Sequence, residues 1–165
     1  MKEVSLGLIK PYGGYENKDK ILSMIESNGL EVPFIKDPYL MTRAQAEHHY
    51  AEKKGMPFYD KLIEMMISRP SVLFLAYGEN AIERFRDICG KTDPAEAAEG
   101  TIRSMFGSKE YMMHNVIHAS DSQKAAKREI EIHLRPEEML ELPRGIREIL
   151  DRTEPYKIEI YTTPN

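Results

Sequence analysis

The segment from Asn115 to Ser122 contains the residues whose types and spacing could do chemistry. It places His118 directly after the apolar pair Val116 and Ile117 and two residues before Ser120, where we expect a helix to begin. A helix N-terminus attracts phosphate through its free N–H groups and its dipole, and it disfavours a charged imidazolium beside it. Because the unperturbed pKa of histidine is about 6.5, His118 would be largely neutral at pH 7. A neutral imidazole can act as a nucleophile.

A carboxylate on the expected helix could orient this histidine. Glu129 lies nine residues after Ser120, which is about two and a half helical turns. Its carboxylate can reach His118 only if the strand end curls over the helix, and it would then fix the tautomer of the ring. The alternative is a structural histidine in front of a helix cap, and this segment alone is compatible with both.

Several other short motifs occur in a fixed order along the chain. Each has an ordinary explanation by itself: Phe58 after a proline often packs in a core, and Thr92 before Asp93 and Pro94 often forms a turn. Their joint order is far more specific than any one of them. The motifs are Leu8–Pro11, Pro57–Tyr59, Thr92–Pro94, Gly100–Arg103, Asn115–Ser122 and Arg128–Ile130.

In these motifs the sequence resembles the nucleoside diphosphate kinase family, over residues 3–140. The resemblance implies a ferredoxin-like α+β fold, in which helices cover one face of a four-stranded antiparallel sheet. It implies a ping-pong reaction that moves the γ-phosphate of ATP or another nucleoside triphosphate to His118 and then to a nucleoside diphosphate. It further implies Mg²⁺, bound through the nucleotide phosphates without a metal site on the protein, and a homo-oligomer.

The resemblance also assigns roles to individual residues. For catalysis it implies His118 as the phosphate carrier, Tyr50 and Glu129 as the residues that position it, and Ser120 as a helix cap that holds Glu129. For nucleotide binding it implies phosphate contacts from Arg86, Thr92 and Arg103, sugar and phosphate contacts from Lys10 and Asn115, and base stacking on Phe58. Lys10 is also counted as catalytic. Stacking tolerates any base because every base has a π-face.

Three places depart from the family pattern. The loop at residues 12–16 lacks the usual acidic and basic residues, Ala119 replaces a glycine at an expected tight turn, and the loop 106–114 is longer and lacks an arginine before Asn115. These departures leave open a nucleotide-binding or scaffolding family member with little turnover. A histidine phosphocarrier that receives phosphate from a partner kinase is a third possibility.

Three other motifs are rejected. Gly90–Thr92 resembles the end of a P-loop, but position 85 is Phe where the first glycine belongs. His114 and His118 have helical spacing in a segment that is predicted to be extended, so they are not expected to share a zinc ion. The methionine pairs at 65–66 and 112–113 are interpreted as packing rather than as a copper site.

The periodicity of apolar residues predicts the elements that must position these side chains. Strands are expected at 4–8, 30–34, 72–77 and 116–117. Helices are expected between Asn17 and Gly29, from Thr42 toward Gly55, after Pro57, at 82–89 and from 123 to about 135. Thr42–Gln45 and Ser120–Gln123 are predicted to be capping boxes. The alternation predicts an α+β sandwich.

Composition excludes several classes of function. The chain has 165 residues and a net charge of −4, so a nucleic-acid backbone is not an expected partner. Its longest apolar run, Val72–Tyr77, is too short to cross a membrane. The single cysteine, Cys89, and the lack of a secretory signal indicate a cytoplasmic protein.

The chain is predicted to comprise a kinase-like domain at 1–140 and an extension at 141–165. In the extension, Ile146, Ile149 and Leu150 have helical spacing, and residues 156–162 alternate like a strand. We expect this extension to pack on a neighbouring subunit, with packing on its own domain as the alternative.

Overall fold

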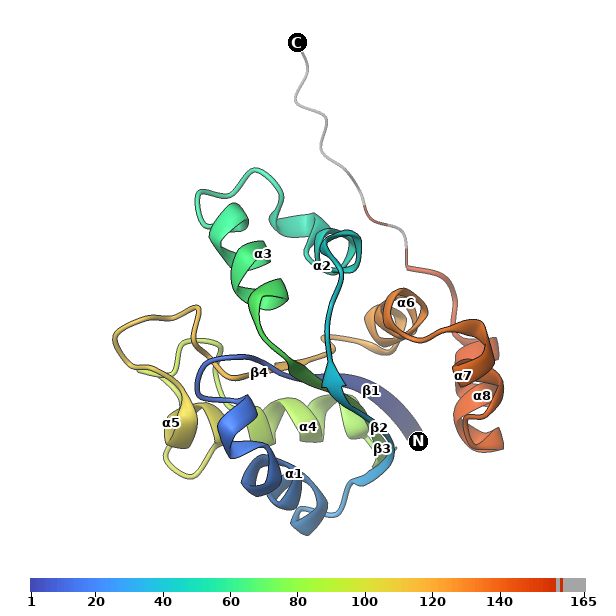
Figure 1. Ribbon diagram of the computed structural model, residues 1–165. Coiled ribbons are helices and arrows are strands. Elements are labelled where there is room, and N and C mark those ends of the chain that lie inside the picture. Colours follow the sequence, from blue (N-terminus) through green and yellow to red (C-terminus); the bar gives the residue numbers. More distant parts are fainter. Residues whose placement is uncertain (157, 159–165) are drawn as a thin grey trace.

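The computed structural model of the chain describes residues 1–156 and 158. At its centre is a four-stranded sheet with the strand order β2-β3-β1-β4, in which every neighbouring pair is antiparallel (Figure 1). The predicted fold class is therefore confirmed. The strands are β1 (Lys2–Ile9), β2 (Glu31–Tyr39), β3 (Ser71–Glu79) and β4 (Ile117–Ala119).

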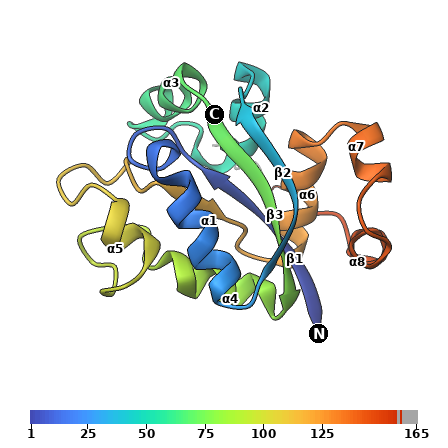
Figure 2. The ribbon, with the colours of Figure 1, turned by 60° about the horizontal axis from the view of Figure 1, so that its bottom comes forward.

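Helices cover both faces of this sheet, whereas the sequence analysis expected them on one face (Figure 2). Alternate residues of a strand point to opposite faces, and both faces of β1 and β3 are buried over most of their length. The helices are α1 (Lys18–Ser27), α2 (Arg43–His49), α3 (Tyr59–Ser68), α4 (Ala81–Cys89), α5 (Ile102–Phe106), α6 (Gln123–His133), α7 (Pro136–Leu140) and α8 (Arg144–Arg152), with 3₁₀ turns η1 (Tyr15–Asn17) and η2 (Ala51–Lys53).

Two hydrophobic clusters result from this double cover. Leu6 and Leu75 face a cluster that contains residues of α2, α3, α6 and α8. Ile9 and Phe74 face a second cluster with residues of α1, α4 and α5. Both faces need a cover because an exposed row of apolar side chains on either of them would remain in water.

The short strand β4 places the central histidine next to the end of β1. Its register pairs Leu8 with His118 and Gly7 with Ala119. Ala119 therefore lies in paired strand rather than in a tight turn, and the expected strain from replacing a glycine is absent there. Gly7 is also paired with Phe74 of β3, and there a glycine is needed because a Cβ at that position would meet the Phe74 ring at 2.2 Å.

The capping signals are confirmed for one helix and wrong for another. Thr42 and Gln45 form the predicted capping box of α2, although α2 ends at His49 instead of continuing toward Gly55. The N-cap of α6 is Ser122, not Ser120. Ser120 is fully buried, and its hydroxyl instead accepts a hydrogen bond from the Leu6 amide at 2.9 Å.

Helix α8 packs against the sheet of its own chain. Its apolar residues Ile146, Ile149 and Leu150 are buried in the same cluster as Leu6, so they are not available to a neighbouring subunit. Most of the predicted tail strand, residues 157 and 159–165, lies outside the described residues. Within the described part of the chain, no helix has the length and apolarity needed to cross a bilayer.

Candidate active site

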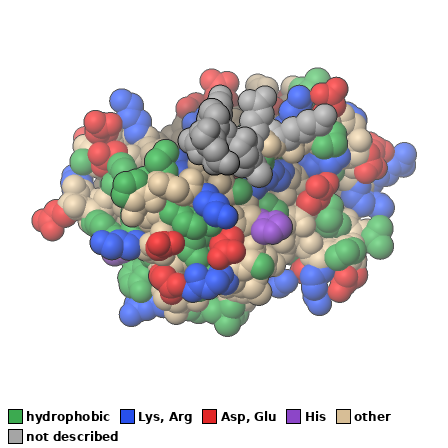
Figure 3. All heavy atoms as spheres, turned by 90° about the horizontal axis from the view of Figure 1, so that it is seen from above, with side chains coloured by type: hydrophobic (Ala, Val, Ile, Leu, Met, Phe, Trp, Pro, Cys, Tyr) green, Lys and Arg blue, Asp and Glu red, His purple; other side chains and the backbone are tan. Residues whose placement is uncertain are grey.

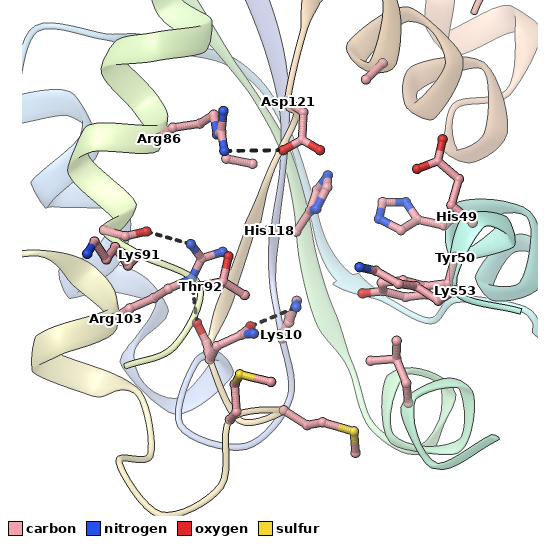
Figure 4. A pocket seen from close by; sticks show the side chains of 18 of the residues that line it. Lys10, His49, Tyr50, Lys53, Arg86, Lys91, Thr92, Arg103, His118 and Asp121 are labelled. Atoms are coloured by element: carbon pink, nitrogen blue, oxygen red, sulfur yellow. Dashed lines mark hydrogen bonds and ion pairs between the residues drawn. The ribbon is translucent and has the colours of Figure 1, made fainter. Parts of the chain in front are cut away.

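A cleft of about 1630 Å³ opens above the end of β1, between the α2–α3 hairpin on one side and α4, α5 and the loops beside them on the other (Figure 4). All of the candidate site residues except Ser120 line it, and Ser120 lies buried next to Glu129. The tertiary structure thus gathers residues from all the motifs into one place. The lining candidates are Lys10, Tyr50, Phe58, Arg86, Thr92, Arg103, Asn115, His118 and Glu129.

His118 is held by one nitrogen and presents the other to the cleft. Its Nε2 is 2.5 Å from Glu129 Oε1, and the Ser120 hydroxyl donates to the same oxygen at 2.9 Å. Because an ionised carboxylate only accepts hydrogen bonds, the Nε2 atom carries the proton of the neutral ring. The lone pair then lies on Nδ1, so the strand end does curl over α6 as this contact required.

Lys10 is a buried amine at the end of β1. Its Nζ donates to Asn115 Oδ1 at 2.9 Å, and its amide donates to the Val116 carbonyl at 2.8 Å. Burial lowers the pKa of Lys10 to about 7, with a further contribution from the nearby charge of Arg103. The amine is therefore only partly charged at neutral pH, and a bound anion would favour its protonated form.

Arg103 on α5 holds the backbone around the histidine. Its guanidinium donates to the carbonyls of Gly90 at 2.7 Å and Asn115 at 3.3 Å (Figure 4), and to the carbonyl of Ile117 at 2.7 Å. These bonds occupy three of the five N–H donors that a guanidinium has. The sequence analysis considered only a phosphate contact and did not identify this connection between three segments of backbone.

The remaining candidates lie along the walls and the rim. Arg86 on α4 faces Asp121 at 3.7 Å, and both side chains are largely exposed. Phe58 precedes α3 at the rim and is 37% exposed. The Tyr50 hydroxyl is buried without a hydrogen-bond partner in the described residues, and burial raises its pKa. This hydroxyl makes no bond to His118 there, so any positioning by Tyr50 acts through packing.

The residue that contacts His118 from α2 is His49, which is not among the predicted site residues. The rings of His49 and His118 meet edge-to-face with centroids 4.5 Å apart. His49 is in turn hydrogen-bonded to His133 on α6. Glu129 and His133 are four residues apart and therefore share one face of α6. This spacing is the sequence signal that could have identified His133 as a neighbour of the site. Lys53, Lys91 and Arg128 also line the cleft, although they were not predicted as site residues.

The loops 12–16 and 106–114, which depart from the family pattern, pack on each other, and Tyr111, Met112 and Met113 of the second loop line the cleft. The Tyr12 ring stacks on His114 with centroids 5.0 Å apart and planes within 7°. The Arg69 guanidinium lies over the Tyr12 ring, with its Cζ 4.7 Å from the ring centroid. His114 does not line the cleft. The departures at 12–16 and 106–114 therefore support one another and leave the candidate chemical residues in place.

The cleft has one group of three side chains that could hold a metal ion in the described residues. His49, His118 and Glu129 bring one potential ligand atom each within 4.8 Å of one another. Two nitrogens and one carboxylate suit zinc-like ions better than Mg²⁺, which prefers oxygen ligands in octahedral geometry.

Comparisons with known proteins agree with this geometry. The family model for nucleoside diphosphate kinase matches residues 3–139. A nucleoside diphosphate kinase of Myxococcus xanthus is 43% identical over 142 residues, which cover 86% of this chain and 96% of that protein. One of Pyrococcus furiosus is 42% identical over 123 residues, 74% of this chain and 76% of its own.

Solved structures show the same fold. The Aquifex aeolicus nucleoside diphosphate kinase superposes with a TM-score of 0.77 and 34% identity, covering 84% of this chain and 99% of that one. The halophilic enzyme from Halobacterium salinarum, solved in complex with CDP, superposes with a TM-score of 0.79 and 29% identity, covering 91% and 99%. The chain belongs to the nucleoside diphosphate kinase family.

Proposed function

We propose that the nucleoside diphosphate kinase reaction of this chain proceeds in two half-reactions through a phosphohistidine at His118. In the first, Nδ1 attacks the γ-phosphorus of a nucleoside triphosphate, an N–P bond forms and the bond to the β–γ bridging oxygen breaks. In the second, a terminal phosphate oxygen of a nucleoside diphosphate attacks the phosphohistidine and the N–P bond breaks. The observation that carries the proposal is the contact of Nε2 with Glu129, which leaves Nδ1 as the free nitrogen.

The charges of the cleft support phosphoryl transfer. The transferring group develops charge on its oxygens, and catalysis depends on groups already in place to stabilise that charge. Lys10, Arg86 and Arg103 lie around His118, and Arg103 retains two N–H donors beyond its backbone bonds. We assign these three cations to the phosphates, with Thr92 as an additional donor.

The base and sugar are assigned to the rim and the floor. Phe58 offers an exposed ring for stacking, and Lys10 with Asn115 is placed to contact the sugar hydroxyls and the terminal phosphate. Stacking without base-specific hydrogen bonds accepts many nucleotides. The alternative of a scaffolding member with little turnover is not favoured, because every candidate chemical side chain is present at or beside the cleft.

The family implies a divalent metal, and we assign Mg²⁺ to the nucleotide rather than to the protein. The nitrogen-rich donor set at His49, His118 and Glu129 does not suit Mg²⁺. Mg²⁺ bound with the nucleotide would supply charge neutralisation at its phosphates. Each step attributed to the protein above uses its own side chains.

We further propose a homo-oligomer and a cytoplasmic location. The edge strand β2 and the segment after it leave Ile35 48% and Leu40 65% exposed, and an exposed apolar edge is a common site of subunit contact. The part of the surface visible in Figure 3 mixes basic, acidic and apolar side chains. Such a surface is unlike the continuous basic patch that binds nucleic acid.

The proposed mechanism is tested by incubating the protein with Mg²⁺ and ATP that is labelled at the γ-phosphate. We expect an acid-labile, base-stable phosphate on the wild type and none on His118→Ala. A protein that binds ATP without becoming labelled would be the scaffold, and one that is labelled only by a partner kinase would be the phosphocarrier. Either result would refute the proposal.

A further inference from the structure

A continuous chain of buried hydrogen bonds leads from the sheet to the ring beside His118. The Tyr39 hydroxyl, at the end of β2, lies 2.7 Å from His133 Nδ1. The opposite nitrogen of that ring, His133 Nε2, lies 2.9 Å from His49 Nδ1. Each of the three side chains is less than 9% exposed, so water does not compete for these bonds.

The groups that face this chain keep both imidazoles neutral. Burial is the main cause that lowers the pKa of His49 well below 6.5 and the pKa of His133 to about 3, and the charge of His118 acts in the same direction. Burial also raises the pKa of Tyr39. The titratable and charged groups that face His49 are His118 on β4, Lys10 on β1, and Arg128 and Glu129 on α6. Those that face Tyr39 are Glu138 on α7 and Lys36 on β2.

Because both imidazoles are neutral, the hydrogen bonds from Tyr39 through His133 to His49 all run in one direction. Tyr39 keeps its proton and can donate it to His133 Nδ1, which as a bare nitrogen accepts. A neutral His133 then carries its own proton on Nε2 and donates to His49 Nδ1. Rotation of the His49 ring would break this bond and leave a buried polar atom unpaired, which costs free energy.

The fixed ring of His49 lies against the ring of His118. Their centroids are 4.5 Å apart with the planes at 76°. On its other side, His118 is bonded through Nε2 to Glu129. His118 is therefore restrained both by a hydrogen bond and by a rigid neighbouring ring.

We propose that Tyr39, His133 and His49 form a positioning chain that holds the His118 ring with Nδ1 directed at the transferring phosphate. His133 and Tyr39 act only through His49, and His49 acts by packing against His118. The inference rests on the proposed phosphohistidine. If the positioning chain had no role, ATP would still label the wild type. A failure of this inference can therefore be distinguished from a failure of the phosphohistidine mechanism.

The test is the rate of His118 phosphorylation in single-turnover experiments at saturating ATP and Mg²⁺. His133→Phe fills the space of the ring but offers no partner to His49. We expect its rate to fall on the order of 10-fold to 100-fold, the loss typical of a misplaced reacting group, with the Kd of ADP unchanged. His133→Gln restores a donor near the Nε2 position and is expected to recover most of the rate.

Leu150→Ala is the matched control for stability. Leu150 is buried in the same hydrophobic cluster as Tyr39 but lies on α8. Its truncation therefore destabilises the fold without changing any residue of the positioning chain. We expect Leu150→Ala to lower the unfolding temperature and to keep the wild-type phosphorylation rate. His133→Phe with a wild-type rate, or Leu150→Ala with an equally low rate, would overturn the proposal.

A second measurement covers the case in which His133→Phe does not fold. Tyr39→Phe removes only the terminal hydroxyl, and we expect a smaller loss of rate with unchanged ADP binding. In the wild type, the imidazole ¹⁵N spectrum should show His49 as one neutral tautomer from pH 5 to pH 8. Titration of His49 near pH 6.5, or exchange between its two tautomers, would contradict the positioning chain.

Discussion

At the scale of single residues, the site depends on which nitrogen or oxygen of each side chain is already engaged. Glu129, which accepts a hydrogen bond from Ser120, engages one nitrogen of His118. Asn115 engages Lys10, and the Tyr50 hydroxyl has no partner in the described residues. The reactivity of each group follows from the atom that remains.

His118→Ala should abolish phosphotransfer while the protein stays folded, because no other side chain can replace the nucleophile. Circular dichroism and the γ-phosphate labelling assay measure the two properties separately. His114→Ala is the matched control. His114 stacks on Tyr12 away from the cleft lining, so this variant should keep most of the activity. A loss as complete as that of His118→Ala would contradict the assignment.

Binding of a nucleotide should transfer a proton to Lys10. The pKa of Lys10 is lowered to about 7 by burial in the free protein, and a bound phosphate raises it again. At pH 8 we expect ADP binding to take up about one proton, measured by calorimetry in buffers that differ in ionisation enthalpy. Lys10→Met should bind ADP more weakly and take up none. Identical heats for the wild type in all buffers would disprove this.

The same shift affects folding. Between pH 7 and pH 10.5 the unfolded chain binds the proton that the folded chain has released at Lys10. The contribution of Lys10 to the free energy of unfolding therefore rises with pH through this window and is constant below it. Lys10→Met should remove this pH dependence, which denaturant titrations at pH 7 and pH 9 would measure.

Phe58→Ala should weaken nucleotides of all bases to a similar degree. A stacking ring contributes about 1–3 kcal/mol per base with little preference among bases. Dissociation constants of ADP, GDP, CDP and UDP should therefore increase together. If only the purines or only the pyrimidines lost affinity, hydrogen bonds to the base would have to explain recognition instead.

At the scale of elements, the cleft depends on short segments that support one another. β4 has only three residues, and α5 has five, so neither would be stable alone. Arg103 connects them, because its guanidinium bonds the carbonyls of Ile117, Asn115 and Gly90. The positions of these segments are therefore coupled through one side chain.

Arg103→Ala should lower turnover more than it weakens nucleotide binding, because its charge is most valuable where the transferring group develops charge. It should also lower the free energy of unfolding by about 1–3 kcal/mol, since buried carbonyls lose their partner. Arg103→Lys keeps the charge but cannot reach three carbonyls. Full stability of both variants would refute the connecting role, and equal losses of kcat and affinity would leave Arg103 only a binding residue.

At the scale of the whole molecule, the C-terminal extension raises the question of assembly. Its described part contacts its own chain: Lys127 Nζ donates to the Thr153 carbonyl at 2.8 Å, and Tyr156 bonds Glu52 at the cleft. The extension therefore covers its own domain through Tyr156. A contact of the last residues with a neighbouring subunit stays a prediction from the sequence.

Ending the chain after Asp151 tests that contact. The truncated protein keeps Ile146, Ile149 and Leu150, which pack on its own core, so we expect it to fold. If the last residues join subunits, light scattering should show a smaller mass, or an assembly that dissociates at higher protein concentration than the full chain. An unchanged mass with unchanged concentration dependence would exclude the tail from the interface.

The sequence by itself determined the order and type of the main elements and, through the family resemblance, nine of the residues that line the cleft. Alternation in β1 and β3, helical spacing in α1 and α4, and the Thr42 capping box are local patterns, and local patterns are readable without a partner. The motif order also singled out His118 and Glu129. Their contact was stated in the sequence analysis only as a condition.

The tertiary structure decided everything that depends on which surfaces meet. Ser120 has the residue type of a helix cap, but its burial beside Leu6 and Glu129 gives its hydroxyl other partners. The bonds of Arg103 to the backbone could not be predicted from the sequence, because the three carbonyls that it bonds come from separate segments. His49 and His133 are 84 residues apart, and only the packing of α2 on α6 brings them together, because hydrogen bonds between distant residues have no periodicity in the sequence.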